Sequence, residues 1–351
     1  MESITTAVTV LGAGPGGLAF VVDCMRRGID ALVYTHKDHQ RTRNAAEKRG
    51  YVAVQGLMEG NAKINFTSEP QEAANFSKIF IMCLRGDVHA DIWLEFQNVD
   101  LSSHLILFIP GSCAEQQLPS GIKFDGVFQA TSTLWSATFI EETLYIGAKK
   151  ASLTAARISK RYERTVEALL NIKVEWVINE FDVATQNASG VFHPPMMIGN
   201  AHRIKLGENF RLYADGLSQE TIFMLSDIDT VRCNIREALG FSKVSTIDTV
   251  NKLYATNFKD IEHFRDQSAL HAMLPAPKTL KNRMLIEDVR VHWVLWYELA
   301  ELLGLDTTPL RQGIERAGEL VGDNFFETGI TLKKLSLGDI SRETFIGKYG
   351  A

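Results

Sequence analysis

The sequence predicts an α/β protein: an N-terminal doubly wound parallel sheet followed by a mostly α-helical C-terminal domain. In the first 150 residues, short apolar runs alternate with helical patterns, which is typical of parallel βαβ units. Beyond that point, segments with a period of three to four residues replace them. The chain has 351 residues, 45% of them hydrophobic, which suffices for about two domains. We therefore expect a first domain over residues 1–150 and a second over 151–351.

Local signals support the individual elements. In the second domain, apolar residues recur at spacings of three and four, which predicts a helix from about Glu287 that ends at Gly304. The next helix is expected after Thr308 as N-cap, with Pro309 at its first position. In the first domain, a helix is expected over residues 16–27. The expected strands are residues 7–11, 31–35, 79–84, 105–109, 126–130 and 144–147.

Composition excludes several functional classes. The formal net charge of −5 argues against a nucleic-acid surface. No apolar run approaches the roughly 18 residues that span a membrane, and no secretory signal opens the chain. The four cysteines, Cys24, Cys83, Cys113 and Cys233, have neither metal-ligand nor disulfide-framework spacing. We expect a cytoplasmic protein that binds no metal, no membrane and no nucleic acid. The sequence is compatible with a homodimer.

A glycine motif follows the first predicted strand. Gly12, Gly14 and Gly17 form the pattern GxGxxG, with Pro15 and Gly16 between them. The motif lies between a strand and a helix, which is the context of a Rossmann-type dinucleotide site. The first glycine permits the tight turn, the second lets the backbone approach the pyrophosphate, and the third allows close helix–strand packing. The helix N-terminus then faces the phosphates.

The end of the second predicted strand bears on the choice of cofactor. An NAD-binding site usually has an acidic residue there, for the ribose hydroxyls. This chain has Thr35 instead, followed by His36, Arg41 and Arg43. Hydrogen-bond donors and positive charge suit a 2′-phosphate, so we predict NADP. Asp38 could still bind a ribose, which keeps NAD as the minority alternative.

Two later loops follow buried strands of the predicted sheet. One includes Leu84, and the other contains Pro110, Gly111 and Ser112. In doubly wound folds, ligands bind at the carboxyl ends of the strands. We therefore predict that both loops line the cofactor and substrate, although ordinary turn chemistry would explain the same residues.

The helical domain has a few polar residues in unusual settings. His193 lies in an apolar stretch and is followed by two prolines, and Arg283 lies five residues before Asp288 at a predicted helix start. Taken singly, the histidine would be interpreted as a packed core residue. The carboxylate would be interpreted as complementing the helix dipole.

Taken together, these features resemble the opine dehydrogenase family. The resemblance rests on the glycine motif, the His193–Pro194 pair, and residues 283–288 with the helix that follows them to Gly304. The family includes octopine dehydrogenase and the octopine and nopaline synthases of crown-gall plasmids, and the likeness is greatest to those synthases. It runs to about Leu335. One departure is Met284, because the family often has Tyr or Phe after the arginine.

The resemblance implies an opine synthase or dehydrogenase, in which NADPH drives the reductive condensation of an amino acid with an α-keto acid through an imine. The product is an N-(carboxyalkyl) amino acid, and pyruvate and 2-oxoglutarate both fit as keto acids. It also implies that His193 is the catalytic histidine, Asp288 its carboxylate partner and Arg283 the ligand of the keto acid's carboxylate. Thr131 and Thr133 match positions that line the family's substrate cleft.

Two alternatives stay open. A two-domain keto- or hydroxyacid reductase of the ketopantoate-reductase type uses a lysine with an asparagine one turn away, and Lys278 and Asn282 have that spacing. Such an enzyme would reduce a keto acid without an amine. The other alternative is a non-enzymatic NADP sensor, which would need the glycine turn but no convergence of His193, Asp288 and Arg283.

Overall fold

The computed structural model describes residues 6–157 and 160–351. The chain divides into two compact units, Met1–Glu180 and Phe181–Ala351, and each has the predicted class of structure. The division lies later than residue 150, because β11 (Ser152–Arg157), α5 (Glu163–Leu170) and β12 (Lys173–Val177) continue the sheet of the first unit.

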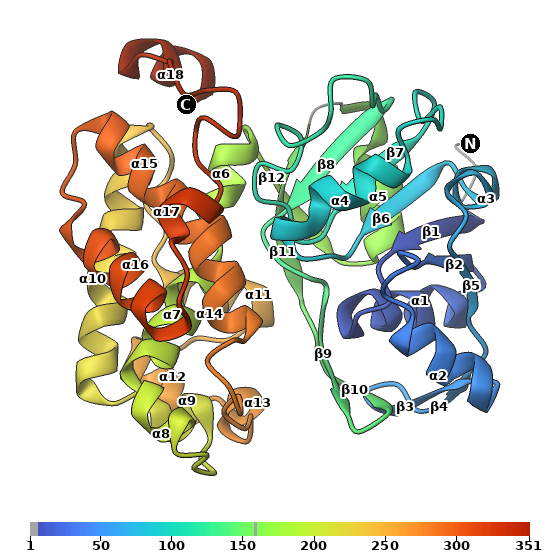
Figure 1. Ribbon diagram of the computed structural model, residues 1–351, viewed down its shortest axis with the longest axis horizontal. Coiled ribbons are helices and arrows are strands. Elements are labelled where there is room, and N and C mark those ends of the chain that lie inside the picture. The colour runs from blue at the N-terminus through green and yellow to red at the C-terminus, as the bar shows by residue number, and fades with distance from the viewer. Residues whose placement is uncertain (1–5, 158–159) are drawn as a thin grey trace. The chain divides into compact units, whose positions relative to one another are not determined.

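The first unit contains, among the described residues, an eight-stranded sheet in the order β12-β11-β8-β7-β6-β1-β2-β5 (Figure 1). All neighbouring strands are parallel except β8 and β11, which are antiparallel. Because the order runs outward from β1 on both sides, the carboxyl ends of β1, β2 and β6 meet at one edge of the sheet. The other strands are β1 (Ala7–Leu11), β2 (Asp30–Tyr34), β5 (Asn65–Thr67), β6 (Ile79–Met82), β7 (Leu105–Phe108) and β8 (Gly126–Ala130).

The strand expected over residues 144–147 forms, but not in this sheet. It is part of β10 (Thr143–Lys149) in a four-stranded second sheet of order β4-β3-β10-β9. A tight turn at Glu141, whose φ is 54°, folds β10 back antiparallel to β9 (Trp135–Ile140). Hairpin closure therefore decides its pairing. The remaining strands of this sheet are β3 (Val52–Gly56) and β4 (Gly60–Ala62).

Helices of the first unit cover both sheets. Helix α1 packs against β2 and β9. Trp93, Phe96, Phe80 and Phe108 are fully buried in an apolar core between α4 and the main sheet. The helices are α1 (Pro15–Arg26), α2 (Arg41–Arg49), α3 (Pro70–Phe76), the 3₁₀ turn η1 (Gly86–Val88), α4 (His89–Glu95), η2 (Lys160–Tyr162) and α5.

The second unit is helical, apart from an isolated bridge between Arg211 and Pro275. Helix α7 packs against α10 and α14. Within the described ranges, no helix is both long and apolar enough to cross a membrane. The elements are α6 (Glu180–Ala184), α7 (Ala188–Gly199), α8 (Ala201–Lys205), α9 (Leu212–Gly216), α10 (Gln219–Ala238), α11 (Thr246–Tyr254), α12 (Ile261–Gln267), α13 (Ala269–Ala272), α14 (Arg283–Asp288), the π turn η3 (Val289–Trp293), α15 (Val294–Leu303), α16 (Thr308–Val321), α17 (Phe325–Thr328) and α18 (Arg342–Tyr349).

The long predicted helix begins one turn earlier than expected. Asn282 is its N-cap and accepts a 3.0 Å hydrogen bond from the Met284 backbone. The π turn interrupts it, and it ends, as predicted, at Gly304 with φ of 72°. The N-cap of α16 is Thr307 rather than Thr308, and the Thr307 hydroxyl binds Glu301 instead of capping the helix.

Candidate functional site

The glycine turn between β1 and α1 is shaped by close backbone contacts. Gly12 has φ of 115°, and a Cβ there would lie 2.9 Å from the Cys83 carbonyl oxygen. A Cβ on Gly17 would lie 2.3 Å from the Gly12 oxygen, whereas one on Gly14 would meet nothing within 4 Å. Gly14 is also the N-cap of α1, whose first N–H groups have no intrahelical partners. The turn therefore presents open backbone at a helix N-terminus, which fits a dinucleotide pyrophosphate.

Beside this turn lies a cavity of about 770 Å³ at the carboxyl ends of β1, β2 and β6. It is lined by six of the residues predicted to hold the cofactor, namely Gly12, Gly14, Thr35, His36, Arg41 and Leu84. The other predicted cofactor residues, all of which the structure describes, lie outside this lining: Pro15, Gly16, Gly17, Arg43, Pro110, Gly111 and Ser112.

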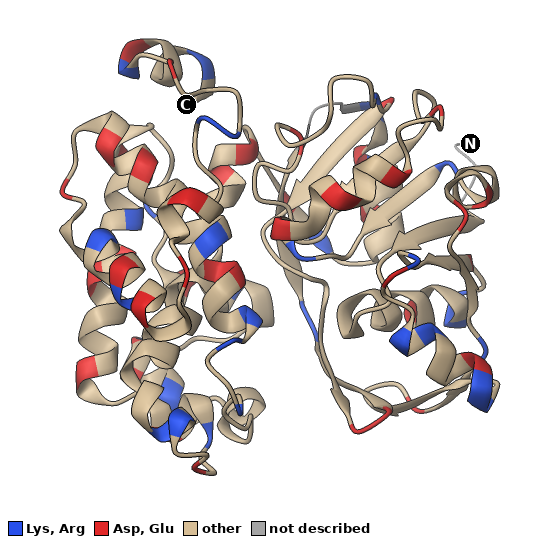
Figure 2. Ribbon diagram, viewed as in Figure 1, with Lys and Arg blue, Asp and Glu red and all other residues tan. Residues whose placement is uncertain are grey.

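The cavity has acidic as well as basic side chains. Figure 2 shows basic residues on α2 and acidic residues on α4, the helix that supplies Asp91 and Glu95 to the lining. Glu95 lies 3.5 Å from His36 and 3.4 Å from Lys37. Glu95 could not be predicted from the sequence, because its position near the end of β2 depends on the sheet order and not on any local pattern.

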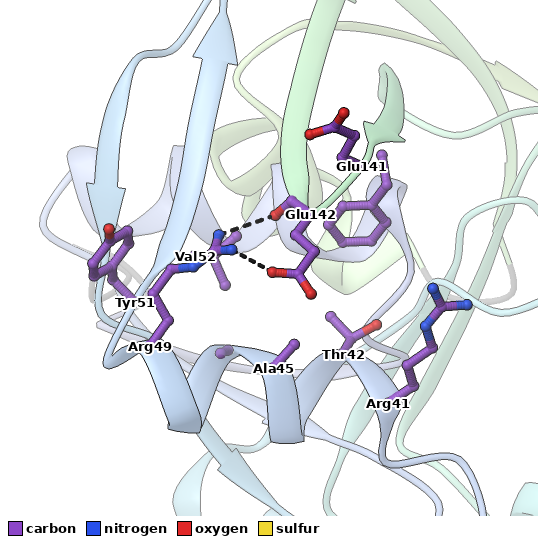
Figure 3. Close-up of a pocket in the computed structure, with 10 residues that line it drawn as sticks. Arg41, Thr42, Ala45, Arg49, Tyr51, Val52, Glu141 and Glu142 are labelled. Atoms are coloured by element: carbon purple, nitrogen blue, oxygen red, sulfur yellow. Dashed lines mark hydrogen bonds and ion pairs between the residues drawn. The ribbon is translucent and has the colours of Figure 1, made fainter.

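The arginines of α2 differ in their partners. Arg43 donates to Glu47 at 2.7 Å and to Ser68 at 3.0 Å, which turns it away from the cavity lining. Arg49 is ion-paired with Glu142 across a smaller cleft of about 240 Å³ between α2 and the β9–β10 hairpin (Figure 3). Arg41 is exposed and borders both hollows. It is therefore the α2 arginine best placed for a bound nucleotide.

The loops after β7 and β8 are tightly packed. A Cβ on Gly111 would lie 2.7 Å from the Gln129 Cβ, so this glycine is needed for packing. Ser112 and Thr131 are buried. Thr133 is adjacent to Gly16, since a Cβ on that glycine would lie 3.5 Å from the threonine methyl. Thr133 thus lies at the glycine turn.

In the second unit, the structure pairs His193 with Asp288. The Nδ1 atom of His193, on α7, is 2.7 Å from Oδ2 of Asp288, at the end of α14. Their side chains are 12% and 5% exposed, so this contact is largely shielded from water. Arg283, at the start of α14, is 56% exposed and donates from Nε to Glu287 at 3.2 Å. The three residues predicted to carry the chemistry therefore come from two packed helices.

Pro194, inside α7, helps to fix this pair. Pro194 has no N–H for the carbonyl of Gly190, four residues earlier. That carbonyl accepts instead a 2.6 Å hydrogen bond from the Trp293 indole in the π turn after Asp288. Gly190 also permits close approach, because a Cβ there would lie 2.9 Å from the Cβ of His292. The helix that carries the histidine is thus tied to the segment that follows the carboxylate.

The neighbours of Asp288 favour its ionised form. Burial raises its pKa, but His193, His292 and Arg283 outweigh burial and hold that pKa below its usual value. His292 lies four residues after Asp288, with Nε2 3.7 Å from Oδ1. Burial lowers the pKa of His292 to about 4, so this second imidazole is neutral at pH 7.

Two residues of this cluster were not predicted from the sequence. His292 could have been found, because a spacing of four puts it on the same helix face as Asp288. Tyr213, on α9, lies with its hydroxyl 3.0 Å from Nε2 of His193, and no spacing in the sequence links the two. Among the described residues, no group of His, Cys, Asp and Glu side chains is placed to hold a metal ion.

Comparisons with known proteins show what the chain is similar to. Residues 176–321 match the family described as NAD/NADP octopine/nopaline dehydrogenase, alpha-helical domain. The chain is 25% identical to vitopine synthase of Allorhizobium ampelinum over 94% of this chain and 95% of the synthase.

Solved structures show the same fold. An octopine dehydrogenase in complex with NADH and agmatine superposes with a TM-score of 0.75 at 16% identity, covering 99% of both chains. An NADP⁺-bound yersinopine dehydrogenase superposes with a TM-score of 0.72 at 14% identity, covering 97% of both chains. The resemblance inferred from the sequence is confirmed: the helical part of the chain matches the octopine/nopaline dehydrogenase family, and nearly the whole chain is similar to vitopine synthase and has the fold of octopine dehydrogenase.

Proposed function

We propose that this chain is an opine synthase or dehydrogenase that condenses an amino acid with an α-keto acid and reduces the resulting imine with NADPH. The single observation that supports it best is the largely buried His193–Asp288 pair, with Arg283 on the same helix as the carboxylate. A shielded imidazole oriented by an ionised carboxylate is suited to accept a proton from an amine near neutral pH.

The proposed roles follow from the chemistry. The amine must be neutral to attack the ketone, and His193 accepts its proton while Asp288 stabilises the imidazolium. Arg283, whose guanidinium is half exposed, binds the carboxylate of the keto acid and fixes which face of the imine is reduced. Thr131 and Thr133 are proposed to line the substrate side of the glycine turn. When bound, the cofactor supplies the hydride.

NADPH is the proposed cofactor. Thr35 replaces the usual strand-end carboxylate, and Arg41 is exposed at the N-terminus of α2 beside the cavity. A 2′-phosphate would pair with this guanidinium. Glu95 weakens the attraction for a 2′-phosphate, because its carboxylate pairs with the side chains of His36 and Lys37. The preference for NADPH over NADH should therefore be moderate.

The reductase alternative has less support from the structure. Lys278 is exposed outside any helix and binds the Asn209 side chain, while Asn282 is occupied as the N-cap of α14. A sensor, in turn, would have no use for a buried His193–Asp288 pair.

The test is cofactor oxidation by the purified protein over a matrix of amino acids and keto acids, with NADPH and NADH in parallel. We expect oxidation only when both an amine and a keto acid are present, and faster with NADPH. Equal oxidation without any amine would indicate a keto-acid reductase and contradict the proposal.

A further inference from the structure

Both ring nitrogens of His193 are engaged in the structure. Nδ1 is bound to Asp288, and Nε2 lies 3.0 Å from the hydroxyl of Tyr213. The tyrosine side chain belongs to α9 and is only 7% exposed as a residue. The nitrogen that would take the substrate's proton is therefore already hydrogen-bonded to a phenol.

The direction of each hydrogen bond follows from the charges. Asp288 is ionised and can only accept, so the neutral imidazole has its proton on Nδ1 and donates it to the carboxylate. Nε2 is then the acceptor, and the Tyr213 hydroxyl must be the donor. Burial raises the pKa of Tyr213 far above its ordinary value, which keeps the phenol protonated at neutral pH.

The phenol ring is confined by other rings. The ring centroid of Tyr213 lies 4.9 Å from that of His271, 5.9 Å from that of Phe264 and 6.0 Å from that of Phe192. Moving the ring away from His193 would disrupt this packing. A substrate would therefore reach the imidazole more readily through the hydroxyl than by displacing it.

We propose that Tyr213 is a catalytic residue whose hydroxyl passes the proton between the substrate amine and Nε2 of His193. This proposal rests on the proposed function. As the amine nitrogen bonds to the ketone carbon, the π electron pair of the carbonyl moves to its oxygen, the amine proton moves to the phenol oxygen and the phenol proton moves to Nε2. This leaves a carbinolamine alkoxide, a regenerated phenol and an imidazolium that faces Asp288. The imidazolium proton returns through the same phenol to the alkoxide, and the carbinolamine then loses water, so no other reactant is required.

The charged and titratable groups around the phenol come from several helices. Asp288 and Arg283 belong to α14, Tyr254 to α11 and His271 to α13. The guanidinium favours the partial negative charge on the phenol oxygen during transfer, whereas the carboxylate opposes it but stabilises the imidazolium. This arrangement favours a concerted transfer over a free phenolate.

The test compares Tyr213→Phe with Tyr254→Phe, a control in the same aromatic cluster whose ring centroid lies 5.4 Å from that of His271. We expect Tyr213→Phe to lower kcat about 10²-fold, the usual scale for a proton-transfer group, with the NADPH KM unchanged. Tyr254→Phe should retain most of kcat.

A solvent-isotope measurement tests the relay directly. When kcat of the wild type is plotted against the fraction of D₂O in the solvent, the points should fall on a curve, because two protons move in the transition state. The residual kcat of Tyr213→Phe should fall on a straight line, because only one proton moves.

A second measurement separates relay from misplacement. Nitrogen NMR of ¹⁵N-histidine-labelled full-length protein should show His193 protonated on Nδ1 in both wild type and Tyr213→Phe, with the Nε2 signal shifted in the variant. Wild-type kcat and an unchanged isotope curve in Tyr213→Phe would overturn the relay while leaving the proposed function intact. A wild type inactive with every amine and keto acid would contradict the proposed function itself.

Discussion

The candidate sites of the two units differ in the groups that form them. In the first unit, the glycine turn is made of backbone: Gly12 and Gly17 allow the close contacts, and Gly14 leaves open space at a helix N-terminus. In the second unit, the polar cluster is made of side chains from separate helices, with His193 and Asp288 brought together across 95 residues of sequence. A site formed by backbone can therefore be recognised from a local sequence motif, whereas a site formed by side chains depends on tertiary packing.

The largest effect is expected on the free energy of unfolding of a variant in the glycine turn. Gly17→Ala puts a methyl group 2.3 Å from the Gly12 oxygen, so we expect it to destabilise the first unit by about 3 kcal/mol or more. Gly14→Ala meets no neighbour, so the free energy of unfolding should stay the same while the NADPH Kd rises about tenfold. Denaturant unfolding and cofactor titration would measure both. Wild-type stability in Gly17→Ala would contradict the packing argument.

A second pair of variants would test the side-chain site. His193→Ala should lower turnover by about 10²-fold or more, and Asp288→Asn by less but still substantially, because the amide cannot stabilise the imidazolium. Steady-state rates at saturating NADPH would show this. Both variants should bind NADPH as the wild type does, since the cofactor cavity belongs to the other unit. Near-wild-type turnover in His193→Ala would place the base elsewhere.

Arg283 should have a smaller effect, because its guanidinium is 56% exposed and water screens it. Arg283→Ala should lower kcat/KM for the keto acid about tenfold, which corresponds to about 1.4 kcal/mol. Arg283→Lys should restore only part of this, since lysine cannot bind a carboxylate with two parallel hydrogen bonds. If the keto-acid KM and kcat stay unchanged in Arg283→Ala, the arginine is only a helix-end cation.

Each unit also contains a buried histidine that should make stability depend on pH. Burial lowers the pKa of His89 and of His292 from 6.5 to about 4. Between these values the unfolded chain binds more protons than the folded one, so the free energy of unfolding should fall as pH drops from about 6.5 toward 4. Each histidine contributes at most about 1.4 kcal/mol per pH unit.

Denaturant unfolding at pH 7, 6 and 5 would measure this loss. His89→Gln and His292→Gln should each reduce the slope, the first for the nucleotide-binding unit and the second for the helical unit. An unchanged slope in both variants would assign the acid sensitivity to other groups.

The smallest effect expected is on cofactor choice. Arg41→Ala should raise the NADPH KM a few-fold and leave NADH nearly unchanged, because only NADPH has the 2′-phosphate. Arg43→Ala should change little, since Glu47 and Ser68 already bind that arginine. Glu95→Gln should lower the NADPH KM by freeing His36 and Lys37. Equal use of NADH and NADPH by the wild type would remove the basis for this preference.

The sequence predicted what short-range chemistry determines. β1 and β8 have the predicted bounds, and α1 begins within the glycine motif at Pro15, because alternation and turn residues are local signals. The location of β10 in a second sheet and the late boundary at Glu180 were not predicted, because both depend on which strands pair over long distances.

The polar cluster was predictable only in part. The roles of His193, Asp288 and Arg283 were expected from the family resemblance, and the structure adds that the first two are in contact. Tyr213 and Glu95 were missed because each approaches its partner only through tertiary folding. The position and charge of Arg41 and Arg43 predicted a phosphate site, but the sequence could not show that Arg43 is bound by Glu47.

Trp293 and Pro194 are linked through the hydrogen bond to the Gly190 carbonyl. The proline leaves the Gly190 carbonyl without its helical donor, and the tryptophan supplies one from another segment. Replacing the tryptophan alone would leave a buried carbonyl unsatisfied, and replacing the proline alone would create an N–H that competes for the same oxygen. During divergence of related enzymes, each position therefore limits which substitutions the other can accept, and the two should change as a pair.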